Sequence, residues 1–577
     1  MTRSVTTGSP RNKAIAEGAP TDRTVDRRDF LRRAAALGAA ASTGALGSTL
    51  LRPSVAAAAA TGAPLRMPDT ALPQEADPAF FSLAEAAAAI RRRELSASEL
   101  VEACLARVER YDGALMAFNT VVADEARAAA RAADSGPVRG ALHGVPLAIK
   151  DNFYTAGVPT TANSHIFADF VPEWDAEAWA RLRARGAILL GKTQMGPLAT
   201  SRATTPDGET TTLNAWAPSD PSISPGGSSS GSATAVAARM ALSSTGTQTG
   251  GSITSPSMAQ GLTGLKPTMG RVSLRGIIPL TYTRDHPGPL ARDAMDAAIM
   301  LTAMAGPDAG DPRTLGQPPL PDLVTAATPV LRGGTPRLRW STRIGVVPGY
   351  LDAPPEPPAP AADAGEEDRR IWERRRAAAA REAESVALRR AMLDTFAQLG
   401  AEIVEVSLPA DWDTLTSGDF NNVRLPERSE PFLEVLRDDV RRFGVSLSPW
   451  INGLLLPGTA YLRGQRAKQL LLRRVLDDLF AHCDVVVQAS PIPFDIVGLP
   501  LITFPIGHRV DDGVTLPVGT ILGGLPWAED RLLSLAAGWQ AVTEWHRARP
   551  EDPAVEAAPP AGERGRLEVW EVDAFGE

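Results

Sequence analysis

The sequence predicts an α/β fold built on a mixed or parallel β-sheet. Two short apolar runs, residues 145–150 (VPLAIK) and 187–190 (AILL), have the length and composition of buried strands. Segments with helical patterns stand before, between and after these runs, and this alternation is typical of a sheet covered by helices. Because 44% of the 577 residues are apolar, the chain can bury a large core.

The first elements follow one another closely. Residues 96–99 (SASE) form a capping box, which predicts the start of a helix that continues through Val108. An Ala-rich helix is expected near 124–134, ahead of the strand that ends at Lys150. A helix over 176–185 then leads into the second strand.

Farther along the chain, Gly- and Pro-rich segments separate the elements. A small-residue helix is expected over 233–240, followed by a Gly-rich turn over 246–252. A strand is expected at 343–347. Residues 353–365 are rich in Pro and Ala and lead into a long charged helix over 366–399.

Residues 1–56 have the order of a secretory signal peptide. Arg27 and Arg28 precede Phe-Leu, an Ala/Gly-rich apolar run to Leu51 and small residues over 55–60. The adjacent arginines indicate the twin-arginine export route. A membrane anchor is the alternative, but the Gly, Ser and Thr content of the run favours cleavage. We therefore expect a secreted or periplasmic protein without stable membrane association after cleavage.

Composition gives the other boundaries. Residues 57–80 are Ala/Pro-rich and are interpreted as a linker. The catalytic domain is expected over 81–548, and within it the Pro/Ala-rich segment and the charged helix form an insert at 353–399. Residues 549–577 are rich in Pro, Glu and Ala and are expected to form a flexible C-terminal tail.

Composition also excludes several classes of function. The net charge is −8 and no basic stripe is visible, which argues against a nucleic-acid partner. The two cysteines, Cys104 and Cys483, cannot build a disulfide framework, and two separate thiols are favoured over a pair. No His, Asp or Glu cluster has zinc spacing, so neither a metal nor another cofactor is expected.

A nucleotide-binding motif is matched in letters only. Residues 186–193 (GAILLGKT) satisfy the P-loop pattern, which would give Lys192 a phosphate-binding role. A P-loop needs a flexible turn whose amides surround phosphates, whereas the intervening AILL is expected to be a buried strand. A strand followed by a turn is therefore the preferred interpretation.

The Gly/Ser run at 227–231 (GSSSG) matches the nucleophile elbow of Ser-His-Asp hydrolases, with Ser229 as nucleophile. That elbow needs a preceding strand, but the segment before it is broken by prolines. Histidines that could serve as a base follow downstream, at positions 286, 482, 508 and 546. A Ser-His-Asp hydrolase is kept as a minor hypothesis, and His286 is preferred as a structural loop residue.

Together, these segments resemble the amidase signature family. Three segments match it in order: residues 142–152 (LHGVPLAIKDN), residues 225–232 (PGGSSSGS), and residues 250–253 (GGSI) followed by 264–268 (GLKPT). The resemblance also includes GKT at 191–193 and GLP at 498–500, and it extends from about Phe81 to His546. Residues 275–280 and 285–292 look most like the peptide-amidase-like and general amidase branch.

The resemblance implies a mixed, twisted sheet surrounded by helices, with Lys150, Ser228 and Ser252 as a catalytic triad. Ser252 is the implied nucleophile, Ser228 follows a cis peptide bond and relays a proton, and Lys150 is the base. These roles make physical sense, because a serine hydroxyl needs a base and burial lowers the pKa of a lysine. The apolar neighbours Leu147 and Ile149 predict that burial.

The resemblance also implies an oxyanion hole made by the backbone amides of Thr249, Gly250, Gly251 and Ser252. Three nearby positions depart from the family pattern. Many members have Asp at position 248 and Arg at 254, where this chain has Gln and Thr. If those two side chains normally pair, their joint absence is compensated, because an unpaired buried charge is worse than none. Ser at position 230, in place of Gly, affects only the shape of the loop.

The expected function is that of a secreted amidohydrolase that cleaves carboxylic amide C–N bonds through an acyl-enzyme. Its partner is a small-molecule or peptide amide substrate. One alternative is an esterase or carbamate hydrolase with the same triad. The others are the glutaminase subunit of a tRNA amidotransferase and a catalytically silent binding protein. The export signal argues against the first of these two, and the intact triad argues against the second.

Overall fold

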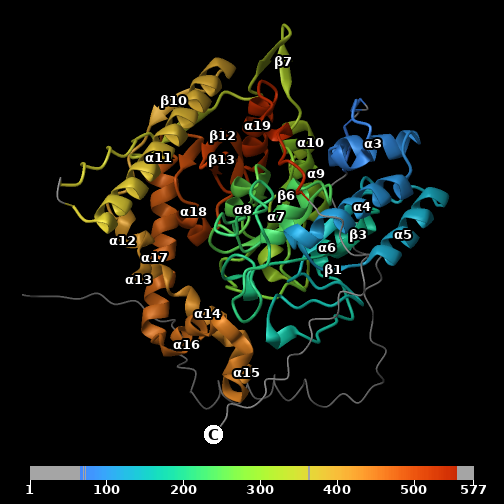
Figure 1. Ribbon diagram of the computed structural model, residues 1–577, viewed down its shortest axis with the longest axis horizontal. Helices are drawn as coiled ribbons and strands as arrows, with labels where there is room; N and C mark the ends of the chain where they lie inside the picture. The colour runs from blue at the N-terminus through green and yellow to red at the C-terminus, as the bar shows by residue number, and fades with distance from the viewer. Residues whose placement is uncertain (1–64, 69, 72, 362–363, 555–577) are drawn as a thin grey trace, which may run out of the picture. The chain divides into compact units, whose positions relative to one another are not determined.

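The computed structural model describes residues 65–68, 70–71, 73–361 and 364–554. Its centre is an 11-stranded sheet in the order β1-β3-β2-β4-β6-β5-β12-β13-β11-β9-β10 (Figure 1). Neighbours such as β2 and β3 run parallel, whereas β12 and β13 run antiparallel, which confirms the predicted α/β fold with a mixed sheet. The strands are β1 (Phe118–Val121), β2 (Pro146–Lys150), β3 (Ile188–Thr193), β4 (Ser244–Gln248), β5 (Thr263–Lys266), β6 (His286–Ala291), β9 (Arg343–Val346), β10 (Glu402–Glu405), β11 (Val485–Gln488), β12 (Leu501–Asp511) and β13 (Val514–Gly524), with a separate hairpin of β7 (Val330–Arg332) and β8 (Thr335–Arg337).

Helices cover the sheet in several apolar clusters. The largest cluster joins α9, α19 and the C-terminal part of α11 to β12, and a second joins α4, α5 and α7 to β2 and β3. The α-helices are α3 (Leu83–Arg92), α4 (Ala97–Leu115), α5 (Ala123–Ser135), α6 (Glu177–Ala184), α7 (Ser230–Ala237), α8 (Thr254–Ala259), α9 (Ala294–Met304), α10 (Leu323–Ala326), α11 (Glu366–Leu399), α12 (Trp412–Thr416), α13 (Gly418–Asn421), α14 (Arg424–Ser429), α15 (Leu433–Asp438), α16 (Leu447–Leu455), α17 (Gly458–Arg474), α18 (Ile492–Val497) and α19 (Glu529–Gln540).

Several local predictions are confirmed. Helix α4 begins with the expected capping box, in which Ser96 and Glu99 satisfy each other's backbone amides. The helices expected near 124–134 and 366–399 appear as α5 and α11. The Gly-rich turn predicted over 246–252 is wrong in its first half. Residues up to Gln248 belong to β4, because they pair with β6, so the turn starts at Thr249.

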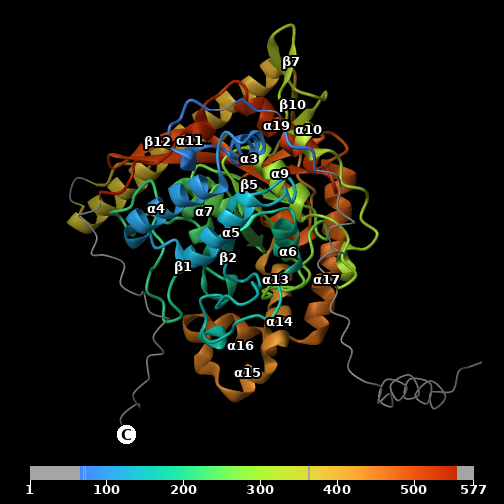
Figure 2. The ribbon, with the colours of Figure 1, turned by 90° about the vertical axis from the view of Figure 1, so that its right-hand side faces the viewer.

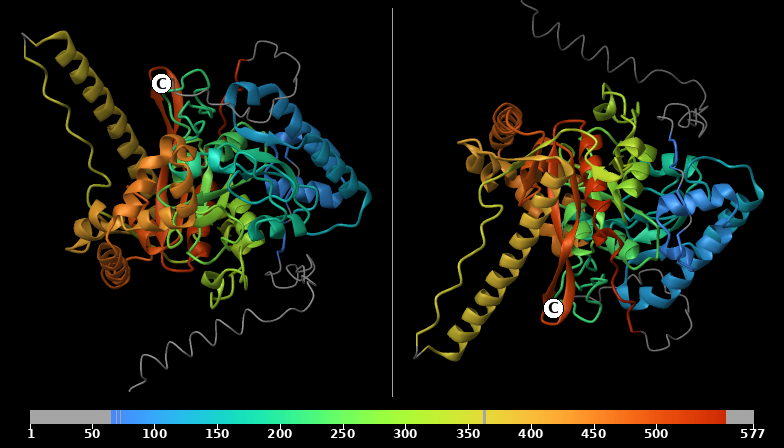
Figure 3. Two further views of the ribbon diagram at one scale, coloured as in Figure 1. Left: turned by 90° about the horizontal axis from the view of Figure 1, so that it is seen from below. Right: turned by 90° about the horizontal axis from the view of Figure 1, so that it is seen from above.

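The insert forms an arm of the molecule. The N-terminal half of α11 is mostly exposed, and Figure 3 shows it reaching outward beside the segment that precedes it. Two contacts join them: Trp372 Nε1 donates to the Pro357 carbonyl at 3.2 Å, and Arg376 pairs with Glu356 at 2.8 Å. The C-terminal half is anchored, because Phe396 and Leu399 are buried in the core.

Helices α14, α15 and α16 form a subsidiary layer, visible at the bottom of Figure 2. Their apolar side chains, including Phe432, Phe443 and Trp450, form a cluster with Leu198 and Ile278 of the loops beneath the sheet. This packing matters for the site, because it fixes α14 and its arginines next to the segment that precedes β6.

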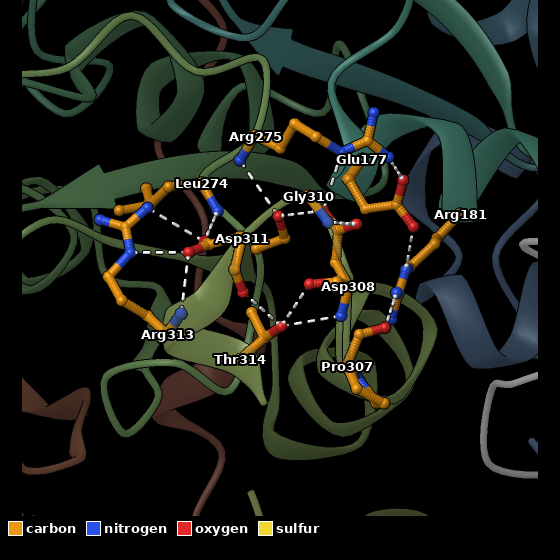
Figure 4. Close-up of polar contacts among 11 residues, drawn as sticks. Glu177, Arg181, Leu274, Arg275, Pro307, Asp308, Gly310, Asp311, Arg313 and Thr314 are labelled. Atoms are coloured by element: carbon orange, nitrogen blue, oxygen red, sulfur yellow. Dashed lines mark hydrogen bonds and ion pairs between the residues drawn. The ribbon is translucent and has the colours of Figure 1, made fainter. Parts of the chain in front are cut away.

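A network of ion pairs fastens that same segment on its other side (Figure 4). Glu177 pairs with Arg181 at 2.8 Å and with Arg275, whose guanidinium also pairs with Asp308 at 2.9 Å. Asp311 pairs with Arg313 at 2.7 Å and accepts the Leu274 amide at 2.8 Å. The charged groups of this network are thus matched with one another.

The predicted signal peptide, residues 1–56, lies outside the described residues, as do most of the C-terminal tail and the first part of the linker. Within the described part of the chain, no helix is long and apolar enough to cross a membrane. Cys104 and Cys483 are buried, free thiols in different apolar clusters, which confirms that they do not pair.

Candidate active site

Two neighbouring strands bring the predicted triad to one edge of the sheet. Lys150 is the last residue of β2, and β4, which runs parallel beside it, ends at Gln248 just before Ser252. The carboxyl ends of parallel strands meet at the same edge, which is where open α/β sheets place their sites. Ser228 arrives from the loop before α7, after a cis peptide bond with Gly227.

Lys150 is held by hydroxyl groups. Its Nζ lies 2.9 Å from Ser228 Oγ and 2.9 Å from Thr247 Oγ1, and the Asn152 amide donates to the same Thr247 hydroxyl at 3.2 Å. The lysine side chain is fully buried. Two hydroxyls therefore fix the amine nitrogen without neutralising its charge.

Burial lowers the pKa of Lys150 to about 7, against which the charge of Asp285 acts only weakly. The other two fully buried lysines differ from it in their partners. Lys192 lies 3.2 Å from Asp151, and Lys266 lies 3.6 Å from Asp495, whereas no carboxylate of the described residues comes within ion-pair distance of Lys150. Lys150 is therefore the buried lysine best suited to be neutral near pH 7 and to accept a proton.

Ser252 sits in the turn that follows β4. Its side chain is near the surface of the site, with the residue 9% exposed, and the neighbouring Gly250 is exposed. Ser229 ties this turn to the Gly/Ser run, because its hydroxyl donates to the Ser252 carbonyl at 2.6 Å. Gly251 has φ +93°, a conformation that glycine adopts far more readily than other residues.

The amide groups of the turn do not all face the site. The Gly251 N–H donates to Asp495 Oδ2 at 2.9 Å, so this amide is already engaged. Among the described residues, no partner is found for the amides of Gly250 and Ser252. An oxyanion would thus be met chiefly by these two amides and Thr249, with Gly251 serving to hold the turn.

Gln248 and Asp495 explain the departures from the family pattern. The Gln248 side-chain amide donates to both carboxylate oxygens of Asp495, at 2.9 and 3.1 Å. Its oxygen accepts the amides of Ile253 and Thr254, at 2.8 and 2.9 Å. The carboxylate missing at position 248 is thus supplied from α18, and no unpaired charge is left in the turn.

Asp285 supports the same turn from the segment before β6. Its carboxylate accepts the Thr249 hydroxyl and the amides of Leu280 and Thr281, both amides within 2.9 Å. Burial raises the pKa of Asp285, and its hydrogen bonds act in the opposite direction. The turn that carries Ser252 is thereby fixed by two buried carboxylates from distant parts of the chain.

Comparison with known proteins decides which family this geometry belongs to. A family model described as Amidase matches residues 99–492. The chain belongs to the amidase family. It is accordingly a hydrolase that acts on amide C–N bonds, with the amidase signature fold.

Relatives of two kinds are similar to this amidase. One is the A-type component of glutamyl-tRNA(Gln) amidotransferase from Anaeromyxobacter sp. (strain K), 36% identical over 470 residues, covering 76% of this chain and 86% of the relative. The protein of the same name from Chloroflexus aurantiacus is 32% identical over 527 residues, covering 82% and 98%. The structure of native peptide amidase from Stenotrophomonas maltophilia has a TM-score of 0.66 and 28% identity, covering 82% of this chain and 98% of that one.

The competing motifs fail on geometry in this amidase. Lys192 lies inside β3, donates to the Phe153 carbonyl at 2.8 Å and pairs with Asp151, so it cannot face a phosphate. Ser229 is fully buried and engaged with Ser252. His286 lies in β6 rather than in the expected loop. Its Nδ1 is 3.3 Å from the Gln248 carbonyl, so it serves the structure rather than a serine.

Sequence reasoning missed four residues that build the site: Asn152, Thr247, Asp285 and Asp495. Asn152 stands in a motif segment, two positions after Lys150, so its place could have been found. Asp495 carries no comparable signal, because it lies 243 positions beyond Ser252 and reaches Gly251 only through the packing of α18.

Proposed function

We propose that this amidase hydrolyses carboxylic amides through an acyl-enzyme on Ser252, with Ser228 as the relay and Lys150 as the base. The observation that carries this proposal is the environment of Lys150. It is a fully buried amine without a carboxylate partner among the described residues, with a pKa of about 7, 2.9 Å from the hydroxyl of Ser228. A base whose pKa lies near the working pH is the most effective one.

The steps follow from this arrangement. Neutral Lys150 takes the proton of Ser228 as Ser228 takes that of Ser252, and Ser252 Oγ attacks the amide carbon. The negative charge on the carbonyl oxygen is met by backbone amides of the turn. The proton then passes back through Ser228 to the leaving nitrogen, and ammonia or an amine departs. Water, activated by the same relay, cleaves the ester and restores Ser252.

Trapping the acyl-enzyme tests this proposal. The purified protein is screened against peptide amides, aryl amides, short aliphatic amides and the matching esters, and Ser252 is probed by mass spectrometry after labelling with a fluorophosphonate. We expect a single labelled serine, Ser252, and a loss of turnover of about 10³-fold or more in Ser252→Ala. Near-native turnover in that variant would refute the mechanism. The ester arm decides whether this triad also serves as an esterase or carbamate hydrolase.

A glutaminase subunit of a tRNA amidotransferase is the second candidate. It is favoured by curated relatives that are 32–36% identical and are named as components of glutamyl-tRNA(Gln) amidotransferase. The two candidates differ in whether activity needs a partner. Ammonia release from glutamine that occurs only with partner subunits and charged tRNA supports the second, and turnover of simple amides by the isolated chain supports the first.

We further propose export by the twin-arginine route, on the basis of Arg27, Arg28 and the apolar run that follows. An exported enzyme acts apart from the translation machinery, so this proposal bears on the choice between the two candidates. N-terminal sequencing of the native protein from the cell envelope and the medium tests it. Recovery of intact chains from the cytoplasm alone would exclude export and favour the second candidate.

A further inference from the structure

A small cavity with cationic walls lies beside the turn that carries Ser252. It has a volume of about 20 Å³, enough for a water molecule or the tip of a carboxylate. Arg284, Arg424 and Lys468 contribute to its walls, together with Asn421 and Ile496. The cations come from the segment before β6, from α14 and from α17, so the fold brings three distant segments together here.

These cations are buried and incompletely paired. Arg284 is 4% exposed; one of its terminal nitrogens donates to the Asn421 side chain, but its Nε has no partner. Arg428, one helical turn after Arg424, is 9% exposed and its Nε also lacks a partner. Lys468 donates to the Thr283 carbonyl at 2.6 Å. Within the described ranges, none of these four cations has a carboxylate within ion-pair distance, 4.0 Å.

The carboxylates nearby are engaged with neutral donors. Glu427 accepts the amide and hydroxyl of Thr283, at 2.8 and 3.0 Å, the Tyr461 hydroxyl at 3.0 Å and the Gln465 amide at 3.1 Å. Asp285 is taken up by Thr249 and two backbone amides. The cluster therefore holds more positive charge than its surroundings neutralise, and buried charges are normally paired.

The pKa values point the same way. Burial lowers the pKa of Arg284 to about 10, that of Arg428 to about 9 and that of Lys468 to about 8. A bound anion would restore these cations by supplying the missing counter-charge.

The cavity is close enough to the reacting turn to serve the same ligand. Ile496 lines the cavity, and Ile492, one turn earlier on α18, lies beside Gly250 of the turn. One helical turn corresponds to about 6 Å along the axis. On the other side, Asp285 follows Arg284 directly in the chain and accepts the Thr249 hydroxyl. A short acyl chain can therefore span from Ser252 to the cluster.

We propose that Arg284, Arg424, Arg428 and Lys468 form a carboxylate-binding subsite, so that the preferred substrates are monoamides of short dicarboxylic acids. This inference rests on the proposed amidase function, because the subsite lies beside the same turn. Glu427 is saturated by its donors and leaves no acceptor for an ammonium group. The cluster accordingly favours glutaramic acid, which lacks the α-amino group, over glutamine.

Substrate preference tests the subsite. The purified protein is compared on succinamic and glutaramic acids and on butyramide, their neutral counterpart. We expect kcat/KM to favour the acids and the ratio of acid to butyramide to fall about tenfold or more in Arg284→Gln and in Lys468→Met. The matched control is Arg466→Gln, an exposed residue on the same helix as Lys468, for which the ratio stays at the wild-type value.

Binding is measured separately from turnover, so that a failure to fold is recognised. Succinate should raise the melting temperature of Ser252→Ala but not that of the double variant Ser252→Ala/Arg284→Gln. Acceleration of butyramide hydrolysis by free succinate would identify a free carboxylate, rather than the substrate's own, as the ligand. An unchanged ratio in both variants with no succinate-dependent stabilisation overturns the subsite but leaves the amidase function standing. If no amide is hydrolysed at all, yet succinate still stabilises the protein, the proposed function fails and the subsite remains.

Discussion

Two regions on either side of the segment before β6 treat buried charge in opposite ways. Around Asp308 and Asp311, each arginine meets a carboxylate, and Glu177 serves two arginines at once (Figure 4). Around Lys150 and Arg284, the cations are as deeply buried but meet hydroxyls, amides and carbonyls instead.

The difference separates structure from chemistry. A paired buried charge holds two segments together but is not free to exchange a proton or bind a ligand, because its partner stabilises the charged form. An unpaired buried cation can lose its proton or accept an anion, at a cost in stability that the rest of the fold must offset. A substitution in one region should therefore have an effect that the matching substitution in the other region does not share.

The largest expected effect comes from removing the unpaired amine. Lys150→Met keeps the length and burial of the side chain but removes the base, so we expect kcat/KM to fall roughly 10³- to 10⁴-fold. Because no ion pair is broken, the free energy of unfolding should change by only about 1 kcal/mol. Steady-state kinetics and chemical denaturation measure the two effects.

The control for that variant is the paired lysine. Lys192→Met leaves the buried Asp151 without its cation, 3.2 Å away, and is expected to cost about 3 kcal/mol or more in stability. If instead Lys150→Met proved the more destabilising of the two, the distinction between paired and unpaired lysines would be wrong.

The next effect is on the paired network. Glu177→Gln keeps the shape of the side chain but removes the charge that serves Arg181 and Arg275. Glu177 and Arg181 are both less than a tenth exposed, so the expected loss is about 3 kcal/mol in the free energy of unfolding. Urea denaturation measures it. The turnover of the molecules that stay folded should remain within about twofold of wild type, and a tenfold loss without destabilisation would contradict the structural role.

The sequence predicted the groups that perform chemistry better than the groups that position them. Lys150 and Ser228 lie in short motif segments, and the apolar strand that buries Lys150 is visible in the sequence, so both place and environment could be inferred. Asp495 and Arg428 could not be placed in the same way. Their roles depend on contacts with Gly251 and Asp285 across gaps of 244 and 143 positions, and no local pattern marks such contacts.

A middle-sized effect is expected at the carboxylate that positions the reacting turn. In Asp495→Asn, one carboxylate oxygen becomes an amide, which faces the Gln248 amide donor to donor, and Lys266 loses its counter-charge. We expect kcat to fall about 10- to 30-fold, or about 2 kcal/mol, while KM changes less. Steady-state kinetics separate the two constants.

The double variant Gln248→Glu/Asp495→Asn exchanges donor and acceptor between the two positions. The glutamate can still accept the amides of Ile253 and Thr254, and the asparagine can still accept the Gly251 amide. Partial rescue of kcat would show that the pair positions the turn. A double variant as slow as the sum of the single losses would mean that the two side chains act independently.

The dependence on pH follows from the lowered pKa of Lys150. Only the neutral amine accepts a proton, so kcat/KM should rise with pH and level off above a pKa of about 7. Below that value the rate should fall about tenfold per pH unit. Stability changes in the same direction, because the pKa is depressed by folding: between pH 7 and the ordinary range of lysine, the unfolded chain binds more protons and raising the pH stabilises the fold. A flat profile from about pH 5 to 9 would exclude Lys150 as the base.

The smallest effect is expected where an ion pair is fully in water. Arg370 on the exposed half of α11 pairs with Glu366 one turn earlier at 2.6 Å, and both side chains are more than three-fifths exposed. Water and salt already stabilise each charge there, and the pair must hold two long side chains in one geometry. Arg370→Ala should therefore change the free energy of unfolding by less than about 0.5 kcal/mol and leave substrate preference unaltered. Urea denaturation at low and high salt measures it beside Glu177→Gln. The two variants each remove one charge from a short ion pair, so a comparable loss in both would mean that burial is not what distinguishes the paired network. A large gap between them would assign the difference to the solvent that the interior excludes.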